Sequence, residues 1–257
     1  MKKIIILCLI LTGCGSTQKG WNAEFVQQCL AQTQRGAGDV QPAPPTVVVM
    51  SGQSNMLGFG KSSELPASLR GPVQNVVIWV NDHWETYKPG PTCFGPDVSF
   101  AAKWSADHPG ERIGIIKFAV GSTHMGRWQP GGDLNLALLN KYRESGALPV
   151  LGFYWVQGES DSNNREYSAL YQQRLESMIV DIRNKIGFSP FVFARTATTG
   201  FAYWETISAA QTYIASFYNQ SSVYLVETLD LSTYEGVHFN TESQIELGTR
   251  LYTMGRQ

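Results

Sequence analysis

The most constraining feature of this chain is a regular alternation of short apolar runs with longer segments whose apolar residues recur at helical spacing. Uninterrupted apolar runs rich in β-branched residues are typical of strands that are buried on both faces. The predicted strands are residues 46–49, 76–80, 113–120, 151–156, 191–194 and 223–226. The alternation therefore predicts an α/β fold, in which a parallel sheet lies between two layers of helices.

Four helices are predicted, three between these strands and one after the last of them. One follows Asp97, a long one begins at Asn164 and ends at Gly187, another lies around Trp204–Tyr218, and the last runs from Thr241 to about Tyr252. Their apolar residues recur at intervals of three and four, which is typical of helices with one buried face. We expect these helices to cover both faces of the sheet.

Length, composition and charge narrow the classes of function. The chain has 257 residues, which suits one α/β domain and is short for two. The formal net charge is −1, and lysine and arginine are scattered rather than clustered. A nucleic-acid partner is therefore not expected. We expect a monomer.

The N-terminus has the features of an export signal. A positive start, Met1-Lys2-Lys3, precedes an apolar stretch that is too short to span a bilayer. It ends in Leu11-Thr12-Gly13-Cys14, which resembles the lipobox of bacterial lipoproteins. We therefore expect residues 1–13 to be a signal peptide and Cys14 to carry lipid that binds the membrane, most simply the outer membrane on its periplasmic or surface face. The alternative is an ordinary signal peptide with a chance cysteine.

Residues 14–45 are interpreted as a tether, and the folded domain is expected to span residues 46–257. Cys29 and Cys93 would both lie in an oxidising compartment, where a disulfide is permitted. Their spacing alone neither requires the disulfide nor suits a metal site.

The first predicted strand leads into the segment Met50-Ser51-Gly52-Gln53-Ser54-Asn55-Met56-Leu57-Gly58. Ser54 would lie at the carboxyl end of a central strand, the edge at which ligands bind in open α/β sheets. It is our candidate nucleophile. The alternative is that Ser54 only caps a short helix that begins at Asn55.

A nucleophilic serine needs a base, an acid that orients the base, and donors for the oxyanion. His238 precedes the last helix, and Glu235 lies three residues before it, across Gly236. A carboxylate at this spacing can fold back onto the imidazole. The alternative is a loop histidine with a solvated neighbour. His124, which follows the third predicted strand, could also face the site.

Four segments occur in an order that resembles a known family. They are Gly52-Gln53-Ser54-Asn55-Met56, a glycine after a strand at Gly121, Trp155-Val156-Gln157-Gly158-Glu159-Ser160-Asp161, and Glu235-Gly236-Val237-His238-Phe239. Together they resemble the sialate O-acetylesterase and acetylxylan esterase branch of the SGNH hydrolases, over roughly residues 46–254.

The resemblance implies a flavodoxin-like, three-layer α/β/α fold and a serine carbohydrate O-acetylesterase. It implies Ser54 as nucleophile and His238 as general base. It also implies an oxyanion hole formed by the backbone N–H groups of Ser54 and Gly121 and by the side-chain amide of Gln157. No metal and no cofactor is needed for this chemistry.

The identity of the acid remains open. The family more often has aspartate three residues before the histidine, whereas this chain has Glu235, and Glu159 is the alternative acid. The substrate also remains open between O-acetylated sialic acids and acetylated xylan or peptidoglycan. Two other hypotheses are a glycan-binding protein with a vestigial site and a lipase or thioesterase. The candidate substrate-binding residues are Gln53, Asn55, Arg127 and Glu159.

Overall fold

The computed structural model describes residues 24–25, 28–29 and 39–256. The predicted signal peptide, Cys14 and most of the predicted tether lie outside these residues. Within the described ranges, no helix is both long enough and apolar enough to cross a bilayer.

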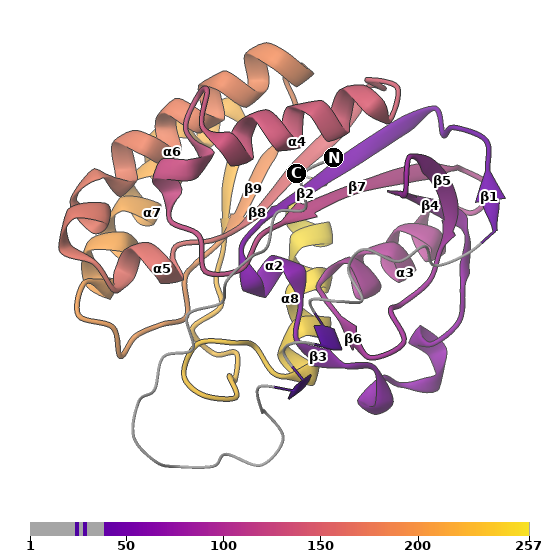
Figure 1. Ribbon diagram of the computed structural model, residues 1–257, viewed down its shortest axis with the longest axis horizontal. Coiled ribbons are helices and arrows are strands. Elements are labelled where there is room, and N and C mark those ends of the chain that lie inside the picture. The colour runs from indigo at the N-terminus through magenta and orange to yellow at the C-terminus, as the bar shows by residue number, and fades with distance from the viewer. Residues whose placement is uncertain (1–23, 26–27, 30–38, 257) are drawn as a thin grey trace.

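An eight-stranded sheet forms the centre of the molecule (Figure 1), in the order β1-β5-β4-β7-β2-β8-β9-β10. The six strands from β4 to β10 in this order are parallel, and β2 lies between β7 and β8. All six predicted strands are present. The strand bounds are β1 Val40–Gln41, β2 Thr46–Gly52, β4 Val73–Val80, β5 His83–Tyr87, β7 Ile113–Ala119, β8 Val150–Val156, β9 Phe191–Ala194 and β10 Val223–Val226; a separate pair is formed by β3 Gly60–Lys61 and β6 Cys93–Phe94.

The sheet is not parallel throughout, because near one edge β5 runs antiparallel to both of its neighbours, β4 and β1, and neither β5 nor β1 is predicted from the sequence. Asn81 and Asp82 have φ values of 47° and 63°, and positive φ at two successive residues is typical of a tight hairpin turn. The chain therefore returns as β5, which begins at His83 and runs antiparallel to β4. Strand β1 pairs with β5, so part of the predicted tether belongs to the sheet.

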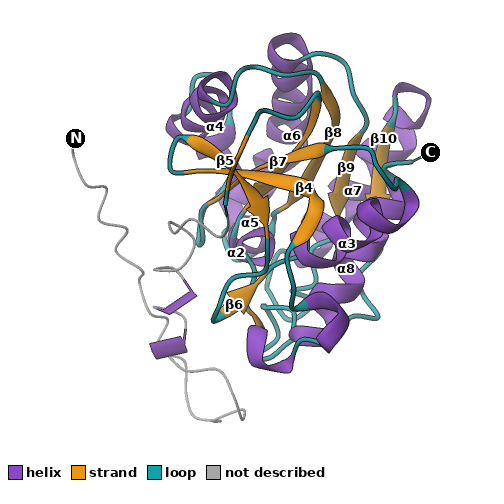
Figure 2. Cartoon of the chain, turned by 90° about the vertical axis from the view of Figure 1, so that its right-hand side faces the viewer, coloured by secondary structure: helices purple, strands orange, loops and turns teal. Residues whose placement is uncertain are grey.

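Helices cover both faces of the sheet, which confirms the three-layer α/β/α fold (Figures 1 and 2). Successive residues of β2 face opposite layers: Val47 and Val49 pack with α4, α6 and α7, whereas Val48 and Met50 pack with α3 and α8. The predicted helices are confirmed as α3, α6, α7 and α8, and α4 is an additional one. The bounds are α3 Asp97–Asp107, α4 Asp133–Glu144, α6 Arg165–Ile186, α7 Trp204–Tyr218 and α8 Thr241–Met254.

A disulfide joins Cys29 to Cys93, with 5.4 Å between their Cα atoms. Both sulfur-bearing side chains are buried with Leu57 and Phe59, which follow the Ser54 turn. The disulfide that the sequence only permits is therefore present, and it fixes part of the segment before the sheet against the loops near that turn.

Candidate active site

Ser54 is held by a backbone turn that only glycine allows. Gly52 ends β2 with φ of 145°, and a Cβ atom on it would lie 2.0 Å from the carbonyl oxygen of Val156. The next N–H, that of Gln53, donates to this same oxygen at 2.9 Å. The chain then enters α2, Ser54–Leu57, without a connecting loop. Ser54 is the first residue of this helical turn rather than its cap, and it lies at the carboxyl edge of the central strand.

Ser54, His238 and Glu235 form a chain of hydrogen bonds. His238 Nε2 lies 3.0 Å from Ser54 Oγ, and Nδ1 is hydrogen-bonded to the Glu235 carboxylate. Glu235 Oε1 also accepts from the backbone N–H of His238 at 3.1 Å. With Nδ1 donating to a carboxylate, Nε2 is the ring nitrogen that accepts the proton of the serine hydroxyl. This is the arrangement that activates a serine for nucleophilic attack.

Glu159 takes a different place in the site. Its Oε1 accepts from Asn55 Nδ2 at 2.5 Å, and Asn55 also contacts the histidine loop through Val237 O at 2.9 Å and Phe239 N at 3.0 Å. Glu159 is fully buried, and this burial raises the pKa of its carboxyl group. His238 Nδ1 donates to Glu235, whereas Glu159 and Asn55 connect the β8 loop to the histidine loop.

Gly121 lies beside the serine. It follows β7 after Val120, whose N–H donates to the carbonyl of Gly52 at 3.0 Å, and a Cβ atom on Gly121 would lie 3.8 Å from the Cβ of Ser54. The absence of a side chain leaves the space next to Ser54 open. Ser54 and Gly121 therefore lie side by side at the same edge of the sheet, although they are far apart in the sequence, and each brings a backbone N–H group to this place.

Gln157, the predicted side-chain donor of the oxyanion hole, donates to other groups of the protein. Its Nε2 donates to Thr123 O at 3.0 Å and to Asp161 Oδ2 at 2.5 Å, which uses both N–H bonds of the amide. The physical reason is that Asp161 is completely buried, and a buried carboxylate needs donors. In this arrangement Gln157 connects the β7 loop to α5, Glu159–Ser162, and offers no free N–H to an oxyanion.

Comparison with known proteins identifies the family. Residues 44–255 match the family described as carbohydrate esterase, sialic acid-specific acetylesterase. The chain belongs to this family. It is therefore a carboxylic ester hydrolase, and the resemblance to the sialate O-acetylesterases is confirmed. Among curated proteins no match was found.

Solved structures share the fold of this carbohydrate esterase. A protein from Arabidopsis thaliana is 24% identical, with a TM-score of 0.72 over 82% of this chain and 97% of that one. A carbohydrate acetylesterase from Xanthomonas citri is 17% identical, with a TM-score of 0.65 over 82% of this chain and 56% of that one. NanS is 14% identical, with a TM-score of 0.60 over 83% of this chain and 97% of that one.

The other predicted substrate-binding residues of the esterase have partners within the protein. Gln53 Oε1 faces the N–H groups of Gly158 and Ser160, each at 3.4 Å. Arg127 forms an ion pair with Asp133, in which the Arg127 Nε lies 3.2 Å from both carboxylate oxygens. Gln53 therefore supports the loops around the serine, and the charge of Arg127 is already balanced.

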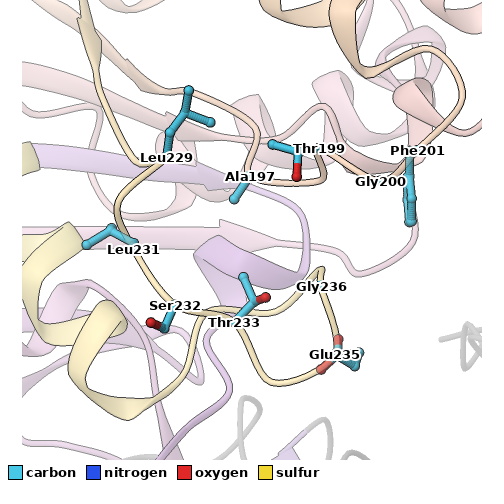
Figure 3. A pocket seen from close by; sticks show the side chains of 10 residues that line it. All are labelled: Ala197, Thr199, Gly200, Phe201, Leu229, Leu231, Ser232, Thr233, Glu235 and Gly236. Atoms are coloured by element: carbon cyan, nitrogen blue, oxygen red, sulfur yellow. The ribbon is translucent and has the colours of Figure 1, made fainter. Parts of the chain in front are cut away.

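A cavity of about 570 Å³ lies between the loops that follow β9 and β10 (Figure 3). Among the described residues that line it, Glu235 alone is charged, and hydroxyl groups and apolar side chains make up most of the rest. The lining residues are Ala197, Thr199, Gly200, Phe201, Leu229, Leu231, Ser232, Thr233, Glu235 and Gly236. Apart from Glu235 and Gly236, the lining residues lie in stretches of two separate loops that carry no motif, so the sequence gives no signal of a site there.

Proposed function

We propose that this esterase removes O-acetyl groups from sialic acids, with Ser54 as nucleophile, His238 as general base and Glu235 as the acid that orients His238. The observation that carries the proposal is the hydrogen-bonded chain from Ser54 through His238 to Glu235. The family description supports the choice of sugar.

The reaction follows from these contacts. Ser54 Oγ attacks the acetyl carbonyl while His238 Nε2 takes the hydroxyl proton. The negative charge on the carbonyl oxygen is stabilised by the N–H groups of Ser54 and Gly121. When the ester bond breaks, His238 returns the proton to the departing sugar oxygen. A water molecule, deprotonated by His238, then attacks the acetyl-enzyme, releases acetate and regenerates Ser54.

Measurement of free acetate tests the substrate. The enzyme is incubated with O-acetylated sialic acids, acetylated xylan and O-acetylated peptidoglycan at matched concentrations of acetyl groups. We expect kcat/KM to be highest for an O-acetylated sialic acid. A higher value for xylan or peptidoglycan would reassign the sugar and leave the ester chemistry in place, whereas no acetate from any of them would contradict the proposed function.

We also propose that the enzyme is anchored to a membrane through lipid on Cys14, as the Leu11-Thr12-Gly13-Cys14 segment indicates. Burial of acyl chains contributes about 0.8 kcal/mol for each CH₂ group, so two or more chains hold a protein firmly. In a bacterial host, the native protein should take up labelled fatty acid and sediment with membranes. The Cys14→Ser variant should do neither. An unlabelled native protein that fractionates like the variant would contradict the anchor.

A further inference from the structure

Arg174 and His124 meet beside Gly126, in the segment that follows β7. A Cβ atom on Gly126 would lie 2.9 Å from His124 Nδ1 and 3.3 Å from Arg174 Nη1, so both side chains reach the same glycine. Within the part of the chain that the structure describes, neither of these two buried nitrogens has a hydrogen-bond partner. A buried guanidinium N–H without an acceptor is costly, and such a donor points to a missing ligand.

The positive charge of Arg174 is not balanced by an ion pair. Among the described residues, the ion pairs of lysine and arginine do not include it. Asp161 is close enough for its pKa to be lowered by Arg174, but its carboxylate accepts from Gln157 and from the N–H of Met125. Burial outweighs this effect and raises the pKa of Asp161 to about 7, which further reduces its negative charge.

His124 adds a neutral ring to the same place. Burial is the main cause that lowers the pKa of His124, and the positive charges of Arg174 and Arg127 add to it. The ring stacks on Tyr167, with 4.1 Å between the ring centroids. Because an imidazole with a lowered pKa is uncharged at neutral pH, the charge at this place belongs to Arg174.

These residues belong to the same edge of the sheet as the nucleophile. His124 follows Thr123, whose carbonyl is bound by Gln157, and it lies three residues after Gly121 beside Ser54. Tyr167 is in the first turn of α6, which begins at this edge. A substrate bound at Ser54 therefore lies at the same edge of the sheet as His124 and Arg174, whose Nη1 has no acceptor in the described part of the chain.

We propose that Arg174, with His124 beside it, binds the carboxylate of an anionic O-acetylated sugar while the acetyl group lies at Ser54. This inference rests on the proposed function and deepens it, because it makes a negative charge on the sugar the feature that is selected. A guanidinium matches the two oxygens of a carboxylate better than any other side chain. A neutral sugar would leave Arg174 without an acceptor, which is the basis for discrimination.

The test compares an O-acetylated sialic acid with its carboxyl methyl ester, which carries the same acetyl group and no charge. In Arg174→Gln, KM for the acid should rise about 10- to 100-fold, the range expected for loss of a charge-assisted hydrogen bond. KM for the methyl ester, kcat for both sugars and turnover of the neutral p-nitrophenyl acetate should remain unchanged. Arg174→Lys should restore part of the affinity for the acid.

Arg143→Gln is the matched control, because Arg143 is exposed near the end of α4, at the opposite edge of the sheet. It removes the same charge and should leave both KM values unchanged. Equal rises in KM for the acid and the methyl ester in Arg174→Gln would overturn the inference, because they would show a structural role. So would an unchanged KM for the acid.

A binding experiment tests this inference independently of the proposed function. N-acetylneuraminate, the free acid without an acetyl ester, and its methyl ester are titrated into Ser54→Ala and into Ser54→Ala/Arg174→Gln. Tighter binding of the acid that is lost with Arg174 supports the anion site even if the enzyme releases no acetate from sialic acids. Equal binding of the acid and the methyl ester to Ser54→Ala overturns it even if acetate is released.

Discussion

Replacement of Ser54 by alanine should lower kcat by about 10⁶-fold, the loss seen when the nucleophile is removed from a serine triad. Alanine has no oxygen to attack the acetyl carbonyl, and His238 then has no hydroxyl proton to accept. The fold should be preserved, because the substitution removes one oxygen from a side chain that is 5% exposed. Acetate release and the thermal unfolding midpoint measure the two effects separately.

Ser51→Ala is the matched control for this variant. Ser51 is also a buried serine, three residues earlier on β2, but its hydroxyl donates to the carbonyl of Phe118 at 2.7 Å. Its loss should cost about 1 kcal/mol of stability, the value of an ordinary hydrogen bond. Turnover should remain within a few-fold of the native enzyme. If Ser54→Ala retained activity similar to that of Ser51→Ala, Ser54 would not be the nucleophile.

The second large effect concerns the acid that orients His238. Glu235→Gln should lower kcat by about 10⁴-fold with little change in KM, the loss seen when the acid of a triad becomes an amide. The carboxylate holds the Nδ1 proton on His238 and stabilises the imidazolium that forms during attack. An amide keeps the size of the side chain but removes the charge.

Glu159→Gln is the natural comparison, since Glu159 contacts Asn55 rather than the imidazole Nδ1. The variant keeps an oxygen that accepts from Asn55, and it leaves the hydrogen bond between His238 Nδ1 and Glu235 in place. It should lose less activity than Glu235→Gln, and part of the loss should appear in KM. Both variants are measured on one acetylated sugar across pH. A nearly active Glu235→Gln beside an inactive Glu159→Gln would reverse the assignment.

Much of the fold follows from short-range patterns. The β-branched run before Gly52 predicts a strand because side chains of this kind pack on a sheet buried on both faces, and short apolar runs likewise predict the other five parallel strands. The helix α4 is not predicted, although Leu134, Leu138 and Leu139 form its buried face. The edge strands β5 and β1 are also missed, because a short strand at an edge depends on the partner that it pairs with.

The sequence by itself determined the six parallel strands, four of the helices, and the contacts between residues that are a few positions apart. The three residues that separate Glu235 from His238, with Gly236 between them at φ of 82°, bring carboxylate and imidazole together in one loop. In the same way, Gly52 followed by Gln53 and Ser54 is enough to predict a tight turn at the end of a strand. Both are properties of a short stretch of chain, so residue type and spacing suffice.

Only the tertiary structure decided which polar and charged groups, far apart in the sequence, form hydrogen bonds or ion pairs with one another. Gln157 donates to Thr123 and Asp161, Arg127 is neutralised by Asp133, and Arg174 is left without an acceptor in the described part of the chain. These outcomes depend on competition among donors and acceptors that several loops bring to one edge of the sheet. A buried polar group must find a partner wherever packing places one, and periodicity along the chain contains no information about that choice.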